Sequence, residues 1–156
     1  MPERDDLTPK PLTSERAGEL LTLQRAAYAS EAQLYRDPFL PALTQTLDDL
    51  RAELDTGPAL GVEFGARLVG AVRWTLDGGV ARIGRLVVAP DLQGRGIGTA
   101  LLRSAELASG AERFELFTGH LSEANLRLYE REGYRRTRRV ELHPGVELVY
   151  LAKVPG

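Results

Sequence analysis

Residues 86–102, LVVAPDLQGRGIGTALL, decide the fold of this chain. A run of apolar residues typical of a strand enters a loop that holds Gly94, Gly96 and Gly98, and apolar residues at helical spacing follow. A helix that starts there leaves backbone N–H groups unpaired and presents the positive end of its dipole, so it attracts phosphate. Glycines without β-carbons would let an anion lie against those groups. Taken alone, the glycines are equally compatible with a turn that serves only backbone geometry.

The spacing of these glycines excludes two common nucleotide-binding motifs. A P-loop requires a lysine between its last glycine and the following Ser or Thr, whereas Thr99 directly follows Gly98. A dinucleotide-binding G-x-G-x-x-G motif would require glycine or alanine at Thr99 or Leu101. The pattern that remains is Gln93-x-x-Gly96-x-Gly98.

Further strands and helices are predicted on both sides of this stretch. Strand-like runs cover residues 8–12, 59–64, 67–76, 80–88, 113–118, 134–142 and 146–154. Helical patterns run from a cap at Thr13 or Ser14 to Ala27, and over residues 43–54, 95–109 and 122–132, the last with Ser122 as its cap. Residues 28–41, YASEAQLYRDPFLP, contain two prolines and several aromatic residues, so we expect a loop there.

This order of elements predicts a single α/β (α+β) domain over residues 1–156, with one mixed, mostly antiparallel sheet of about six to seven strands flanked by four helices. The chain has 43% hydrophobic residues, enough for one core, and no cysteine for disulfides or thiolate sites. The net charge of -2 gives no general attraction to nucleic acid or acidic membranes. No apolar run matches a signal peptide or a membrane span. We therefore expect a cytoplasmic protein without nucleic-acid or membrane partners.

The glycine stretch and residues 122–134, SEANLRLYEREGY, together resemble the two signatures of the GCN5-related N-acetyltransferase (GNAT) family. The order of strands and helices fits that family over nearly the whole chain. The resemblance implies acetyl-CoA as co-substrate and no metal. Main-chain groups of Leu86, Val87 and Val88 would bind the pantetheine arm. The diphosphate would be held by backbone amides of Gln93, Gly94, Arg95, Gly96, Ile97, Gly98 and Thr99.

A glycine inside the strand over residues 80–88 agrees with this resemblance. Gly84 interrupts apolar residues, which is typical of a β-bulge or a close backbone approach, or of a glycine tolerated for packing. In the family, a bulge in this strand helps to separate it from its parallel neighbour, here residues 113–118. The separation leaves a wedge for the pantetheine arm.

The second signature contains the expected catalytic residue. Asn125 and Tyr129 are four residues apart and share one face of a helix. A tyrosine in such a place is usually a packing residue, but the resemblance implies that Tyr129 acts as general acid on the thioester sulfur and that Asn125 binds the pantetheine arm. A phenol of pKa about 10 donates to a thiolate of about 8.5 at a cost near 2 kcal/mol. We therefore expect Tyr129 to stabilise the thiolate by a hydrogen bond.

The general base is left open by the resemblance. Many family members carry a glutamate on the fourth strand, whereas residues 80–88 contain Arg82 and Arg85 and no acid. An amine of pKa about 10.4 must lose a proton before it attacks, at a cost of about 4.6 kcal/mol at pH 7. The candidates are Glu63, His120, Glu31, Asp37 and water. Each of these side chains is more simply explained as a solvated or salt-bridged surface residue.

Aromatic residues of the expected loop are candidates for the acceptor pocket. Tyr28, Tyr35 and Phe39, with the carboxylates of Glu31 and Asp37, would suit a small cationic or amphipathic amine, and simple packing explains them equally well. The run Arg135–Arg139 could attract an acidic group, although a solvated edge strand is the simpler interpretation.

The resemblance implies an enzyme that transfers acetyl directly from acetyl-CoA to a primary amine of a small molecule or peptide, in a ternary complex. The alternative is a non-catalytic acyl-CoA-binding or sensory module, which the missing acid on the fourth strand favours and Tyr129 opposes. A dinucleotide oxidoreductase is disfavoured by the glycine spacing. A homodimer is compatible with the family.

Overall fold

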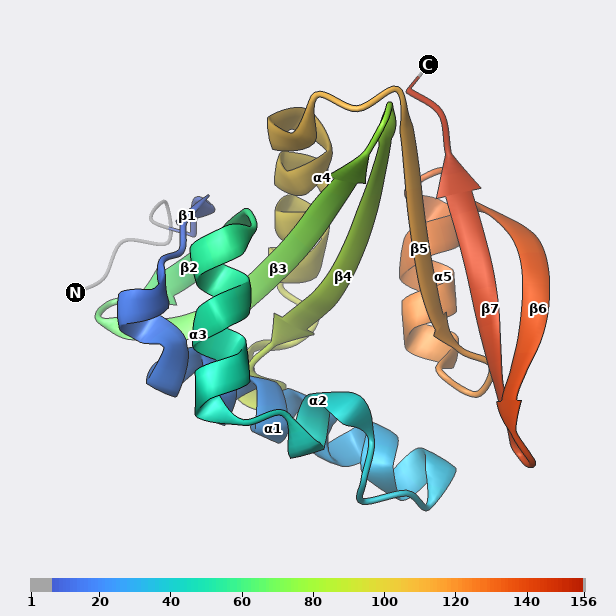
Figure 1. The fold of residues 1–156 in the computed structure, drawn as a ribbon, viewed down its shortest axis with the longest axis horizontal. Coiled ribbons are helices and arrows are strands. Elements are labelled where there is room, and N and C mark those ends of the chain that lie inside the picture. Colours follow the sequence, from blue (N-terminus) through green and yellow to red (C-terminus); the bar gives the residue numbers. More distant parts are fainter. Residues whose placement is uncertain (1–6, 156) are drawn as a thin grey trace.

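The computed structural model describes residues 7–155, which form one seven-stranded sheet with helices packed around it (Figure 1). The strands lie in the order β1-β2-β3-β4-β5-β7-β6. Their bounds are β1 Lys10–Pro11, β2 Ala59–Phe64, β3 Arg67–Asp77, β4 Val80–Val88, β5 Arg113–Gly119, β6 Arg135–His143 and β7 Val146–Lys153. The helices are α1 Ala17–Tyr35, α2 Pro41–Thr44, α3 Leu47–Thr56, α4 Ile97–Ser109 and α5 Glu123–Arg131. The expected mixed, mostly antiparallel sheet is confirmed.

The sheet splits between β4 and β5. These two strands are the parallel pair of the sheet. They are paired only at Val80↔Arg113, Ala81↔Phe114 and Arg82↔Glu115. Beyond Arg82 the two strands diverge, so β1–β4 and β5–β7–β6 form the two arms of a wedge (Figure 1). The backbone groups of β4 that would face β5 beyond this point have no strand partner, and they become available to a ligand.

A β-bulge lies in β4 where the strands diverge. Arg73 pairs with Gly84 and Ala71 pairs with Val87, so β4 has one more residue than β3 in this interval. The expected bulge is therefore confirmed beside Gly84, but the left-handed backbone belongs to Arg85, with φ of 51°. Such a conformation costs a residue with a β-carbon about 1–2 kcal/mol. Added twist from the bulge turns the end of β4 away from β5.

Helix α1 extends through the segment where a loop was expected, so that prediction is wrong for residues 28–35. Both prolines of the segment, Pro38 and Pro41, lie beyond the end of the helix, and the residues before them are compatible with helix. The helix ends at Arg36 in the left-handed conformation, with φ of 53°. Tyr28 and Tyr35 are therefore held on a rigid helix.

The second predicted helix is divided into α2 and α3, which gives five α-helices where four were expected. Gln45 is extended, with ψ of 133°, and interrupts the pattern. Thr46 then caps α3, because its side-chain oxygen accepts a hydrogen bond from the N–H of Asp49 at 3.2 Å. A favourable new cap explains why the chain restarts the helix here.

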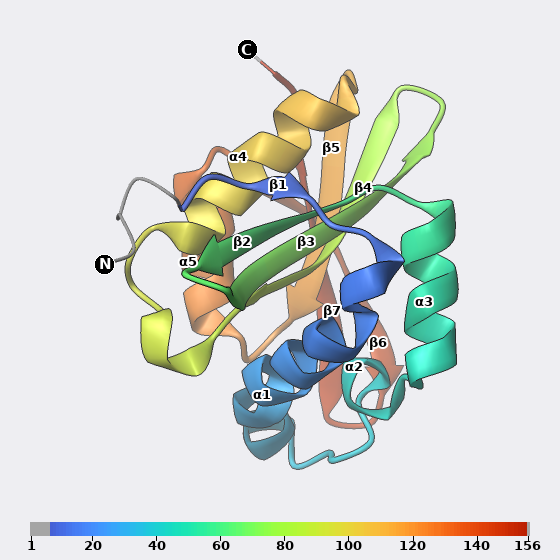
Figure 2. The same cartoon turned by 90° about the vertical axis from the view of Figure 1, so that its left-hand side faces the viewer.

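The helices cover both faces of the β2–β4 arm (Figure 2). A β-carbon on Gly70 would meet Ile97 and Leu101 of α4 at 2.9 Å, so α4 packs closely on one face of β3. Arg73, three residues later and therefore on the opposite face, reaches α1 and α3 instead. Completely or almost completely buried side chains fill both layers, among them Leu20, Leu50, Val62, Val69, Val72, Leu101 and Leu102.

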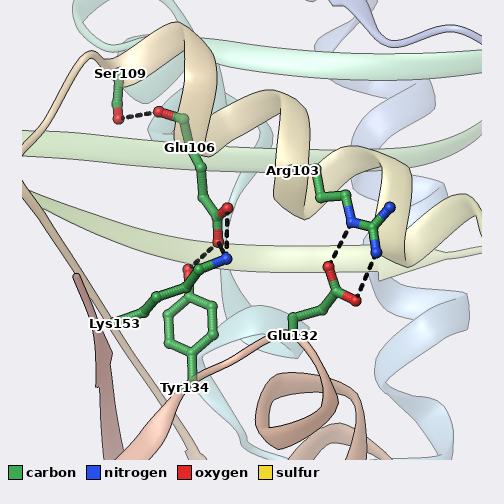
Figure 3. A network of polar contacts seen from close by, with 6 residues as sticks. All are labelled: Arg103, Glu106, Ser109, Glu132, Tyr134 and Lys153. Carbon is green, nitrogen blue, oxygen red and sulfur yellow. Dashed lines mark hydrogen bonds and ion pairs between the residues drawn. The ribbon is translucent and has the colours of Figure 1, made fainter. Parts of the chain in front are cut away.

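A polar network joins α4 to the second arm of the sheet (Figure 3). Glu106 of α4 accepts hydrogen bonds from the Tyr134 hydroxyl at 2.7 Å and from the ammonium of Lys153 at 3.0 Å. Arg103, one turn earlier, donates to the carboxylate of Glu132 at 2.6 and 3.1 Å. Together with the three β4–β5 pairs, these contacts hold the two arms together at one end of the wedge.

Candidate functional site

A cavity of about 700 Å³ occupies the wedge between the two arms of the sheet. Its lining includes all of the residues expected to bind coenzyme except Arg95, whose side chain is exposed. It also includes Tyr129, the expected catalytic residue, and Gly84 at the bulge. A β-carbon added to Gly84 would meet no atom within 4 Å, so this position borders open space rather than a packed neighbour.

The glycine loop has the backbone conformation of an anion cradle. Gly94 and Gly96 have φ of 78° and 83°, which residues with a β-carbon rarely adopt. Gly96 is the N-cap of α4, and its carbonyl accepts the first helical bond from Ala100 at 3.0 Å. Helix α4 therefore begins two residues later than the predicted Arg95, and the amides of its first turn have no helical carbonyl to bind. These amides border the cavity at Ile97 and Gly98.

Helix α5 forms another wall of the cavity. The Asn125 amide donates to the hydroxyl of Thr118 at 3.2 Å, which ties α5 to β5. Tyr129 is only 7% exposed, and its ring lies 6.1 Å from that of Tyr134. Burial raises the pKa of Tyr129 well above its usual value, and the nearby Tyr28 and Glu31 raise it further. The phenol therefore stays neutral and keeps its proton for donation.

Helix α1 contributes a hydrogen-bonded chain on the facing wall. The hydroxyl of Ser122 donates to the carboxylate of Glu31 at 2.6 Å, so its oxygen accepts the proton of Tyr35 at 2.7 Å. The Tyr35 oxygen in turn accepts the N–H of Leu121 at 2.9 Å. A β-carbon on Gly119 would collide with the hydroxyl of Tyr35, so only glycine permits this approach. These hydrogen bonds fix the carboxylate of Glu31 beside the cavity.

This chain of hydrogen bonds corrects the role expected for Ser122. The residue stands at the N-cap of α5, as predicted, but its side chain makes no capping bond. Sequence reasoning also missed the contribution of Gly119, since no local pattern relates it to Tyr35. Its partner lies 84 positions earlier in the chain, and only the tertiary fold brings the two together.

Only Glu31 among the four proposed protein bases lines the cavity. Glu63, on β2, forms an ion pair with Arg16 at 3.0 Å. Asp37 accepts the N–H of Phe39 at 2.9 Å in the turn after α1. The Nδ1 atom of His120 lies 3.0 Å from the backbone nitrogen of Glu147 and 3.2 Å from its carbonyl oxygen, outside the cavity lining.

The remaining candidates from the sequence are divided between the cavity and the exposed surface. Phe39 is 76% exposed and does not line the cavity, whereas Tyr28 and Tyr35 do. The arginine-rich strand β6 is exposed along its length. Its side chains make local contacts, with Arg136 on Glu130 at 3.0 Å and Arg138 over the ring of Tyr150 at 4.2 Å. This strand is therefore a solvated edge.

The family assignment rests on a match of residues 56–136 to the family model described as an acetyltransferase (GNAT) domain. The chain belongs to the GNAT acetyltransferase family. It is 29% identical over 133 residues to UPF0157 protein YqkA of Bacillus subtilis (strain 168), in a match that covers 85% of this chain. The chain spans 38% of the length of that curated relative.

Solved structures share this GNAT fold. Smu.2055 from Streptococcus mutans UA159 has a TM-score of 0.79 at 14% identity, over 94% of this chain and 98% of that one. The PaiA N-acetyltransferase from Thermoplasma acidophilum, solved in complex with coenzyme A, has a TM-score of 0.75 at 18% identity, over 94% and 98% of the two chains. At these identities the similarity establishes the fold.

Residues 7–155 contain neither a helix suited to a membrane span nor a side-chain cluster suited to a metal ion. None of the helices in this range combines the length and apolar character needed to cross a membrane. The same residues contain no group of three or more His, Cys, Asp or Glu side chains that could hold a metal ion.

Proposed function

We propose that this GNAT protein is an N-acetyltransferase that moves an acetyl group from acetyl-CoA to a primary amine by direct transfer in a ternary complex. One observation carries the proposal: the same cavity is bordered by the glycine loop, by Tyr129 and by the end of β4, which has no strand partner on the β5 side. An anion cradle, an extended backbone edge and a neutral phenol are the groups that bind and activate a thioester of coenzyme A.

The coenzyme would lie along the wedge. Backbone amides from Gln93 to Thr99 would hold the diphosphate against the start of α4. Main-chain groups of Leu86, Val87 and Val88, which β5 leaves unpaired, would bind the amides of the pantetheine arm in the manner of an added strand. Asn125, on the other wall, would contact the same arm.

Tyr129 would stabilise the leaving group. When the amine nitrogen bonds to the thioester carbon, the carbon–sulfur bond breaks and its electron pair goes to sulfur. The phenol can donate a hydrogen bond to the developing thiolate. Complete proton transfer is unfavourable already at a phenol pKa of about 10, and burial raises the pKa of Tyr129 above that. The role that fits is hydrogen-bond stabilisation, with the proton staying on Tyr129.

Glu31 would receive the proton that the amine must lose, directly or through water. It lies near enough to Tyr129 to affect the pKa of the phenol. Its carboxylate is oriented by the hydroxyl of Ser122 at 2.6 Å, which leaves its other oxygen available. A carboxylate at this place also attracts the protonated amine to the cavity before transfer.

Calorimetric titration with acetyl-CoA, CoA and NADH tests the proposal, followed by a free-thiol assay over a panel of amines. Binding of acetyl-CoA with amine-dependent thiol release is the expected result. Binding without release from any amine would instead favour a non-catalytic acyl-CoA-binding module, and absence of CoA binding would refute both.

Three expectations from the sequence stay predictions: a single domain over residues 1–156, a cytoplasmic location and a homodimer.

A further inference from the structure

Arg85 is a half-buried cation at the wall of the cavity. It lines the cavity beside the bulge of β4, and residues 7–155 offer it neither a hydrogen bond nor an ion pair. Every other arginine in this range that lacks a carboxylate partner is exposed. A guanidinium at the wall of a cavity can be bound by an anion, and the described part of the chain provides none for Arg85.

The backbone of Arg85 is also unusual. Its left-handed conformation, with φ of 51°, is uncommon for a residue with a β-carbon. The glycine that would adopt this conformation at no cost, Gly84, is the preceding residue. Backbone outliers of this kind gather at ligand-binding sites. The bulge therefore fixes the position of Arg85 at the cavity wall.

The guanidinium of Arg85 lies near that of Arg73. Burial lowers the pKa of Arg73, and the positive charge of Arg85 acts in the same direction. Arg73 is itself held by Glu53 at 3.0 Å and by Gln24 at 3.3 Å, on the face covered by α1 and α3. Glu53 balances one of the two positive charges, so one remains uncompensated at this end of the cavity.

A negative charge lines the same cavity. Tyr28 lies near both Arg73 and Tyr129, and it lines the cavity together with Arg85 and Glu31. Glu31 lies one turn after Tyr28 on α1, about 4.5 Å along the helix axis. Glu31 also lies near enough to Tyr129 to raise the pKa of the phenol, and both residues line the cavity.

We propose that the acceptor is an amine that also carries a carboxylate, which Arg85 binds while the amine lies beside Tyr129 and Glu31. This inference rests on the proposed transferase function and specifies its substrate class. A guanidinium binds a carboxylate through paired N–H donors, with a geometry that an ammonium or an amide does not reproduce. A purely cationic amine would leave the charge of Arg85 uncompensated and would be repelled by it.

The test compares each carboxylate-bearing amine with the amine that lacks its carboxylate. The panel contains the common α-amino acids and unbranched amino acids from glycine to aminohexanoate. Kd is measured by calorimetry with and without saturating CoA, and kcat/KM is measured by thiol release. We expect at least one carboxylate-bearing amine to bind about tenfold or more tightly than its matched amine.

Substitution of Arg85 identifies the residue responsible. R85Q should abolish this preference while leaving the Kd of acetyl-CoA unchanged. R82Q is the matched control, because Arg82 lies on the same strand but is exposed, forms an ion pair with Asp77 at 3.1 Å and does not line the cavity. This control should retain the preference.

Three outcomes would overturn the inference. The first is that no carboxylate-bearing amine binds more tightly than its matched amine, even if other amines are acetylated. The second is that R85Q keeps the preference. The third is weaker acetyl-CoA binding by R85Q, which would assign Arg85 to the coenzyme. Failure of the unaltered protein to bind CoA would refute the proposed function separately, since the coenzyme-free titrations still measure the carboxylate preference.

Discussion

At the scale of single residues, the hydroxyl of Tyr129 is the group whose removal should separate binding from chemistry. The Y129F variant keeps the ring that packs beside Tyr134 and loses the donor. Because a donor to the developing thiolate acts only during transfer, we expect kcat to fall about 100-fold and the Kd of acetyl-CoA to change less than twofold. Thiol release and calorimetry measure the two effects.

Tyr134 provides the control for this substitution. It is also a buried tyrosine, but its hydroxyl donates to Glu106 at 2.7 Å, and the residue does not line the cavity. Y134F should lower the melting temperature and leave kcat near normal. An undiminished kcat in Y129F, or an equal loss in both variants, would remove Tyr129 from the mechanism.

At the scale of elements, the ion pair between Arg103 of α4 and Glu132 after α5 should make stability depend on pH. The hydrogen bond from Arg103 lowers the pKa of Glu132 below its usual value. A carboxylate with a lowered pKa stabilises the fold above its unfolded-state pKa of about 4.3, and this contribution is lost as the pH falls through the folded-state value. Since Arg103 is largely exposed, we expect E132Q to lower the free energy of unfolding at pH 7 by only about 0.5–1 kcal/mol.

Urea unfolding of the unaltered protein, E132Q, R103Q and the double variant at pH 7 and pH 3 measures this contribution. At pH 7 the losses of unfolding free energy in E132Q and R103Q should not add up in the double variant. At pH 3, where the carboxylate is protonated, the loss in E132Q should be smaller. An equal loss at both pH values would show that Glu132 acts through packing rather than charge.

Elements differ in how far the sequence predicts them. The strands followed from alternating residues, and the glycine loop followed from its spacing, because both patterns are local. The end of α1 was missed because aromatic residues and nearby prolines suggested a loop, although the prolines lie beyond Arg36. Contacts such as Ser122 with Glu31, 91 positions apart, have no local signal. The same holds for the left-handed backbone that the bulge imposes on Arg85 instead of Gly84.

At the scale of the whole molecule, acetyl-CoA should act as a clamp between the two arms of the sheet. The arms share three β4–β5 pairs, and the cavity between them is bordered by the glycine loop on one side and by α5 on the other. A ligand at about 100 times its Kd adds about 2.7 kcal/mol of stability. For a chain of this size, that corresponds to a rise in melting temperature of roughly 5–10 °C.

The G96E variant should remove this rise, because its carboxylate would occupy the anion cradle and repel the diphosphate. Substitution at Gly96 also strains the backbone, so the control must share that cost. Gly110, at the other end of α4, has φ of 62°, and a β-carbon there would likewise meet no atom within 4 Å. G110E should therefore lower the melting temperature of the free protein by a similar amount and keep the full rise with acetyl-CoA. A normal rise in G96E would mean that the ligand stabilises the protein without using the cradle.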